Sequence, residues 1–155
     1  MICSIVVSKY IKECSFAEAY EVATKLRPED VQECVEGHGI VPTRDIPLAL
    51  LSCHTEAFYV PDGRIAGLVG VYGSGAIWML CTEAVEDHPI LFVKEAKAYI
   101  ESRKEQRLFN ICDKRNVLHL KLLKLLGFNF TGEVLHGPNN LPFIEFEKCA
   151  LPPLE

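Results

Sequence analysis

The residues LFNICDKRNVLHLKLLKLLGFNFT, positions 108–131, hold the strongest structural signals of this chain. The short apolar run Leu108–Cys112 predicts a buried strand. A helix should begin at Asp113 or Asn116 and end at Gly127, because glycine commonly follows the last residue of a helix. Another strand is expected directly after this glycine. A strand, a helix and a further strand in this order are typical of an α/β domain.

Signals on either side extend this pattern over the rest of the chain. Ser15 and Glu18 have the spacing of a capping box, and Asp62-Gly63 between apolar runs indicates a hairpin. Strands are expected at residues 2–8, 56–60, 65–72, 76–81, 108–112, 128–131 and 143–147, helices at 16–26, 28–36 and 89–102, a helical turn near 47–53, and a loop across 37–42. We therefore expect a mixed sheet with helices on both faces, in the order β-α-α-β-β-β-α-β-α-β-β.

Length and composition limit the possible classes of protein. A chain of 155 residues and 17.4 kDa corresponds to one domain, expected at 1–150, with a short tail at 151–155. Hydrophobic residues at 49% and charged residues at 24% exclude a disordered chain, a collagen-like fibre and a coiled coil. Residues 65–82 carry no charge, but Gly73-Ser74-Gly75 interrupts them, which favours two strands over a membrane helix.

Charge and cysteine content argue against several partners. The net charge of −5 does not suit phosphate neutralisation, so no nucleic-acid partner is expected, and Arg103–Arg107 and Lys114–Arg115 are interpreted as solvated surface. The seven cysteines form no CxxC pair, which predicts reduced thiols and no metal site. The N-terminal residues lack the pattern of a secretory signal, and we expect a cytoplasmic protein without membrane contact.

Two groups of residues resemble a known superfamily. Asn116 followed after eleven residues by Gly127-Phe128 is similar to the helix signature of the GNAT acyltransferases. Residues 26–30, Leu-Arg-Pro-Glu-Asp, look like the first-helix region of the same superfamily. The resemblance covers roughly residues 26–131 and implies a GNAT-like fold that uses acetyl-coenzyme A.

A narrower resemblance points to a phage branch of this fold. Its residues are Gly75 to Thr82 (GAIWMLCT), His88-Pro89, Phe92, Leu108-Phe-Asn110, Asn116 and Leu125 to Phe128 (LLGF). This branch includes the internal virion protein A of T7-like podoviruses. The resemblance implies a phage or host protein as partner, and a place in the virion or in the cytoplasm of the infected bacterium.

The expected coenzyme A loop departs from the superfamily pattern. Where that pattern has glycines before a helix, this chain reads TEAVEDHP, residues 82–89, without a glycine. Pro89 lacks a main-chain N–H, and Glu83, Glu86 and Asp87 would repel a pyrophosphate. The sequence therefore predicts a degenerate phosphate site, and no bound cofactor is expected.

The expected proton donor is also replaced. The superfamily tyrosine corresponds to Leu123, which cannot donate a proton, and His119 is the substitute if the protein is active. We expect His119 to be a hydrogen-bonded core histidine and His119→Ala mainly to lower stability. Asn116 is interpreted as a helix N-cap that in active relatives also contacts the cofactor. A helical wheel of the helix that ends at Gly127 predicts one broad apolar face, formed by Leu118, Leu122, Leu123, Leu125 and Leu126.

Two functions remain open from the sequence. The first is a non-catalytic virion or assembly component, or a protein-binding module. The second is an acetyl-coenzyme A-dependent N-acyltransferase acting on a protein or a small amine, with Met79, Leu80, Cys81 and Asn116 as cofactor-binding residues. An enzyme should keep an open, polar slot between the fourth and fifth strands. A scaffold should fill this slot with side chains such as Trp78 or Phe109, and expose an apolar patch elsewhere.

Overall fold

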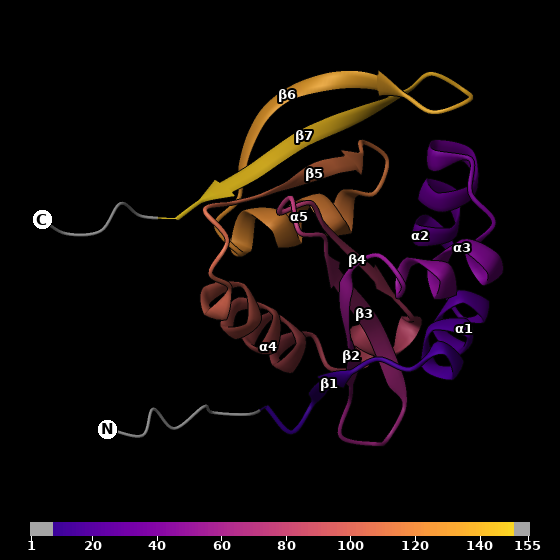
Figure 1. The fold of residues 1–155 in the computed structure, drawn as a ribbon, viewed down its shortest axis with the longest axis vertical. Helices are drawn as coiled ribbons and strands as arrows, with labels where there is room; N and C mark the ends of the chain where they lie inside the picture. Colours follow the sequence, from indigo (N-terminus) through magenta and orange to yellow (C-terminus); the bar gives the residue numbers. More distant parts are fainter. Residues whose placement is uncertain (1–7, 151–155) are drawn as a thin grey trace, which may run out of the picture.

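The computed structural model describes residues 8–150, and Figure 1 shows how its elements are arranged. The strands are β1 (Ile11–Glu13), β2 (His54–Tyr59), β3 (Ile65–Val71), β4 (Ile77–Cys81), β5 (Arg107–Asp113), β6 (Asn129–His136) and β7 (Leu141–Cys149). The α-helices are α1 (Phe16–Thr24), α2 (Pro28–Gln32), α3 (Pro42–Ala49), α4 (Pro89–Ser102) and α5 (Val117–Leu125). A π-helical segment, η1 (Glu33–His38), continues α2, and a 3-10 helix, η2 (Glu83–Asp87), precedes α4.

The strands form two antiparallel sheets that meet side by side. One has the order β1-β2-β3-β4 and the other the order β5-β7-β6. They touch where β4 and β5 begin, through a parallel bridge between Ala76 and Phe109. There the Phe109 N–H donates to the Gly75 carbonyl oxygen at 3.1 Å, and Asn110 Nδ2 donates to the Ile77 carbonyl oxygen at 2.8 Å. Beyond this junction the ladder between the sheets stops, which leaves a slot between β4 and β5.

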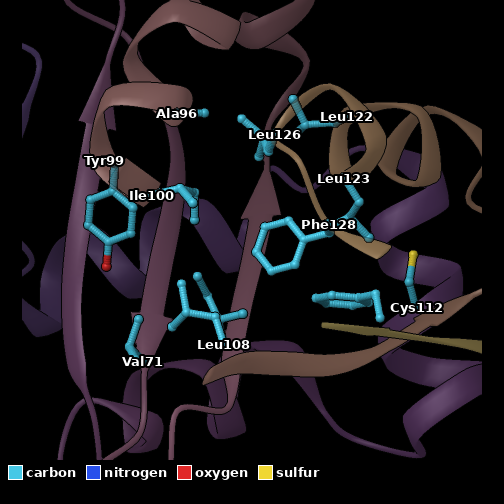
Figure 2. Packing of buried hydrophobic residues seen from close by; sticks show 12 residues of the cluster. Val71, Ala96, Tyr99, Ile100, Leu108, Cys112, Leu122, Leu123, Leu126 and Phe128 are labelled. Atoms are coloured by element: carbon cyan, nitrogen blue, oxygen red, sulfur yellow. The ribbon is translucent and has the colours of Figure 1, made fainter. Parts of the chain in front are cut away.

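Helices cover both faces of the strands, as the sequence predicted (Figure 1). On one face α4 and α5 bury an apolar cluster against β5 and β7, and Figure 2 shows Leu123 and Phe128 among its side chains. On the other face α1 and α3 pack over β2, β3 and β4, with Val22 and Leu68 in their shared core. Burial of such side chains contributes about 1.5–3 kcal/mol each.

Three local predictions are confirmed. The Glu18 N–H donates to the Ser15 hydroxyl and the Ser15 N–H to the Glu18 carboxylate, which completes the capping box of α1. Gly63 has a φ of +93° in the turn between β2 and β3. Gly127 has a φ of +89° after α5, a conformation that glycine adopts without steric strain.

Several boundaries differ from the prediction. The first strand was expected at residues 2–8 and the tail at 151–155, and residues 2–7 and 151–155 lie outside the described part. The strand β1 at Ile11–Glu13 was not predicted. The helical turn near 47–53 is present, with N–H bonds from Leu50, Leu51 and Cys53 back to residues 47–49, but it ends a longer helix. That helix, α3, begins at Pro42, where the Asp45 carboxylate accepts the Val41 N–H at 2.7 Å. His38 ends η1 instead of lying in a loop.

The broad leucine face of α5 is narrower than the wheel suggested. Leu122, Leu123 and Leu126 are buried, but Leu118 and Leu125 are exposed. The helix packs on one side only, so its flanking positions stay in contact with solvent. None of the helices within residues 8–150 combines the length and the apolar character that a membrane-spanning helix needs.

Candidate functional site

The slot between β4 and β5 contains a cavity of about 280 Å³. Met79, Leu80 and Cys81 on β4 line it, as does His119 on α5, so four of the predicted site residues are brought together. Asn116 is not part of the lining. Trp78 lines the cavity without filling it, and most of the other lining side chains are apolar. The slot is therefore open but not polar, a combination that neither of the two sequence-based expectations describes.

The edge of β4 that faces the slot is partly occupied by the chain itself. The Cys81 N–H donates to Asp30 Oδ2 at 2.8 Å, and the Cys81 carbonyl oxygen accepts the Arg27 N–H at 2.9 Å. At the start of the strand, the Ile77 carbonyl oxygen accepts from Asn110. Main-chain groups alternate in direction along a strand, so those of Met79 lie on the same edge between these two occupied positions.

Asp30 connects several elements from its buried position at 2% exposure. Its other oxygen, Oδ1, accepts a hydrogen bond from Asn116 Nδ2 at 2.9 Å and lies 3.5 Å from Arg27 Nη1. Asn116 occupies the N-cap position of α5 as predicted, but its side chain makes no capping bond there and donates to Asp30 instead. Its Oδ1 is buried without a hydrogen-bond partner in the described chain.

Glu33 makes the matching contact on the other side of the slot. Its Oε1 accepts the Asp113 N–H, at the end of β5, at 2.6 Å. Burial raises the pKa of the Glu33 carboxyl, and the nearby His119 partly opposes this shift. The continuous segment α2–η1 therefore spans the slot, with Asp30 bound to β4 and Glu33 bound to β5.

No tyrosine stands at the position of the expected proton donor. Leu123 is buried in the cluster below α5 (Figure 2). His119 is half-buried, and its ring lies close to Glu33 and Cys112. Burial and the negative charge of Glu33 raise the pKa of the Cys112 thiol far above its ordinary value, so Cys112 is not an activated nucleophile.

The segment before α4 does not fit a pyrophosphate. The N–H groups of Ala84, Val85 and His88 all donate within residues 82–88, to Thr82 Oγ1, the Thr82 carbonyl oxygen and the Val85 carbonyl oxygen. Glu83, Glu86 and Asp87 bring three carboxylates to η2. Arg27 and Arg64 are paired with Glu86 and Asp87. The residues present thus do not fit the phosphates of coenzyme A, although the cavity has room for an acyl arm.

Sequence reasoning missed the two carboxylates that close the slot. Asp30 was quoted only as part of the Leu-Arg-Pro-Glu-Asp resemblance, and Glu33 was not singled out. A signal was present: the two residues are three apart after Pro28, a spacing that places both on one side of a helix. Acidic residues are almost never fully buried unless they are paired, so an exposed position was the default expectation.

Comparison with protein-family models and with curated protein sequences gives no match. Solved structures do match. The aminoglycoside acetyltransferase AAC(6')-Ib in complex with coenzyme A superposes with a TM-score of 0.64 and 15% identity, covering 90% of this chain and 94% of the other. A GNAT-family acetyltransferase from Bacillus anthracis has a TM-score of 0.64 and 11% identity, and the match covers 90% of this chain and 93% of the other. A putative ribosomal-protein-serine acetyltransferase from Vibrio cholerae has a TM-score of 0.61 and 16% identity, and the match covers 94% of this chain and 97% of the other. The chain therefore has the fold of the GNAT acetyltransferases.

Proposed function

We propose that this chain is a GNAT-fold protein-binding module whose coenzyme A site is blocked by its own residues at the edge of β4 and at the phosphate end, although the slot itself is open. The observation that carries the proposal is the contact of Asp30 and Arg27 with Cys81. These bonds use the main-chain groups of Cys81, at the end of β4 that lies away from its junction with β5, which we call the wide end of the slot. They lie on the edge of β4 that an extended acyl arm would pair with. A buried charged cluster of this kind is costly to open, because each group would lose its partners.

The segment before α4 supports the same proposal. An anion site at a helix start needs free N–H groups and the positive end of the helix dipole. Here three of the N–H groups have internal partners, and Pro89 has none to offer. The carboxylates of Glu83 and Glu86 lie in the first turn of η2, where they suit the positive end of its dipole, and together with Asp87 they oppose the charge of a phosphate.

A binding module also needs an outer surface for its partner. Among the described residues, seven exposed large apolar side chains lie in the N-terminal helical region: Phe16, Tyr20, Val31, Val35, Val41, Leu48 and Leu51. Exposed apolar side chains that gather on one region are typical of protein interaction sites. We assign the partner surface to this region, and the partner to the class of proteins. A phage virion component, with a phage or host protein as partner, stays a prediction from the sequence resemblance.

Binding measurements with two ligands test the closed site. Acetyl-coenzyme A and S-acetylpantetheine carry the same acyl arm, and only the first carries phosphates. We expect isothermal titration to detect no binding of either up to millimolar concentration, and no rise in melting temperature. Micromolar binding of acetyl-coenzyme A, at least about tenfold tighter than S-acetylpantetheine, contradicts the proposal, because such a preference requires a working phosphate site.

The cavity favours one second candidate, an N-acyltransferase acting on a protein or a small amine. Its support is the open slot, which the main-chain groups of Met79 face and which His119 lines. In this candidate His119 would exchange the proton in place of the missing tyrosine. A test is release of free coenzyme A thiol in the presence of polyamine or peptide amines. Turnover that His119→Ala abolishes without lowering the melting temperature would select this candidate over the binding module.

A further inference from the structure

Three metal-ligating side chains meet inside the wide end of the slot. Glu33 comes from η1, Cys112 from β5 and His119 from α5, and their ligand atoms all lie within 4.8 Å of one another. Glu33 and Cys112 are buried, and His119 is half-buried. In Figure 2 the sulfur of Cys112 points from β5 toward α5, the helix that carries His119. We propose that Glu33, Cys112 and His119 bind a Zn²⁺ ion.

The distances suit a zinc ion after small side-chain rotations. Three atoms no more than 4.8 Å apart have a common centre at most about 2.8 Å from each, the side divided by √3. Zinc bonds are about 2.0–2.3 Å long, so each ligand atom has to approach the centre by at most about 0.5–0.8 Å. Sulfur, imidazole nitrogen and carboxylate oxygen are the three ligand types that zinc takes in proteins.

Charge balance separates this ligand set from a mere cluster of acidic groups. A Cys112 thiolate and a Glu33 carboxylate carry two negative charges, and a neutral His119 adds none. Zn²⁺ therefore gives a neutral centre, which suits a dry environment. The Asp113 N–H that donates to Glu33 Oε1 at 2.6 Å holds the carboxylate in place, as partners beyond the ligands commonly do.

The fourth position of the ion would face the cavity. Glu33 and His119 both line that cavity, so a water molecule or a small ligand reaches the metal from there. The spacing of the three ligands explains why sequence patterns indicate no metal site. They stand at positions 33, 112 and 119, and only the fold brings them together. The metal site shares the slot with the proposed coenzyme A site, but its test does not depend on whether coenzyme A binds.

Metal uptake by the full chain tests the proposal. After treatment with a chelator and dialysis against zinc, we expect about one zinc per chain by mass spectrometry of the metal content. With Co²⁺ as the probe, we expect the visible bands of a tetrahedral ion together with a thiolate-to-cobalt charge-transfer band. The cobalt bands report a sulfur ligand directly, so the wild-type chain already tests the involvement of a cysteine.

Matched variants assign the ligands. Cys112→Ser should abolish the charge-transfer band and weaken zinc binding by at least about tenfold, whereas Cys34→Ser, at another buried cysteine, should keep both. His119→Gln should weaken binding, and His54→Gln, at an exposed histidine, should not. If Cys112→Ser does not fold, protection of Cys112 from alkylation by zinc in the wild-type chain gives the same answer. Any of three results overturns the proposal. They are no zinc uptake at micromolar free metal, a charge-transfer band that survives Cys112→Ser, and alkylation of Cys112 at the same rate with and without zinc.

Discussion

The two ends of the slot between β4 and β5 are held by different kinds of interaction. At the narrow end, Phe109 and Asn110 bond to main-chain carbonyl oxygens of residues 75 and 77. At the wide end, the buried carboxylates of Asp30 and Glu33 bridge from α2–η1 to the two strands. The narrow end is held by neutral groups, one main-chain bond and one side-chain bond. The wide end depends on charged groups in a dry environment, so we expect it to respond far more strongly to substitution and to pH.

The largest expected effect is at Asp30. Asp30→Ala removes the acceptor of two buried donors, the Cys81 N–H and Asn116 Nδ2, at about 1–3 kcal/mol each. It also takes away one of the three carboxylates around Arg27, so the free energy of unfolding should fall by about 3–5 kcal/mol in all. Urea denaturation measures this loss. Asp62→Ala, at an exposed aspartate paired with Arg64, is the control and should leave the stability nearly unchanged, because solvent screens an exposed ion pair.

A double variant shows whether charge is the cause. Replacing Arg27 with Met and Asp30 with Leu removes both charges and keeps similar volume, so it should recover much of the lost stability. Equal losses for Asp30→Ala and Asp62→Ala would show that the wide end does not rely on its buried charges.

The narrow end should be most sensitive at Gly75. This residue has a φ of +94°, and an added Cβ would lie 2.1 Å from the Arg107 carbonyl oxygen. Gly75→Ala should therefore cost about 1–2 kcal/mol for the left-handed backbone and about 1–3 kcal/mol more for the clash. Gly63→Ala separates the two causes, because Gly63 has a φ of +93° with no atom within 4 Å of the added Cβ. Identical costs for the two variants would mean that close approach of β4 and β5 is unimportant.

His119 comes next, since it lies at the wide end without being fully buried. His119→Ala should lower the free energy of unfolding by about 1–2 kcal/mol, through lost contacts in the slot. His54→Ala, at an exposed position, is the control. A thermal melt with an acetylation assay on the same samples decides the outcome. Loss of acetylation at an unchanged melting temperature would make His119 a catalytic residue.

The contrast between the two ends also explains what the sequence could predict. Strands and helices follow from local patterns, so the Ser15–Glu18 capping box, the turn at Gly63 and the end of α5 at Gly127 were all found. The open slot follows from the divergence of β4 from β5, which no local pattern encodes. Met79 and His119 were placed beside it only through the resemblance to a family.

The wide end could not be predicted for a physical reason. Whether a carboxylate is buried depends on partners distant in sequence, and Asp30 meets Asn116 only in the folded chain. Asn116 was assigned to the start of its own helix because the local capping interaction is the usual choice for asparagine. In the folded chain Asn116 donates to the buried Asp30 carboxylate instead, because a buried charge needs hydrogen-bond partners more than a helix end that solvent can reach.

A smaller effect is expected at the neutral contact of the narrow end. Asn110→Ala removes the hydrogen bond to the Ile77 carbonyl oxygen at a half-buried position, which should cost about 0.5–1.5 kcal/mol. Asn129→Ala, at an exposed position of β6, should stay within about 0.5 kcal/mol of the wild-type stability. Chemical denaturation of both variants measures the difference. A loss at Asn110 as large as that at Asp30 would remove the distinction between the two ends.

The smallest expected effect is a dependence of stability on pH, and it arises at His38, at the end of η1. His38 ends η1, and its Nδ1 lies 3.0 Å from His136 Nε2. Burial and the neighbouring His136 lower the pKa of His38 to about 4, from 6.5 for a free imidazole, while the charge of Asp113 partly opposes the shift. The folded state therefore binds this proton less readily than the unfolded state. The contribution is present above pH 6.5 and is lost as the pH falls toward 4.

Because His38 is partly exposed, solvent screening should limit the loss to the order of 1 kcal/mol. Urea denaturation at pH 7 and pH 5 measures it, and His38→Gln should reduce the difference between the two pH values. His54→Gln should leave that difference unchanged, which separates His38 from the general titration of surface groups. If His38→Gln keeps the full pH dependence, the end of η1 contributes no charge-sensitive contact, and the sensitivity of the wide end lies with Asp30 and Glu33 alone.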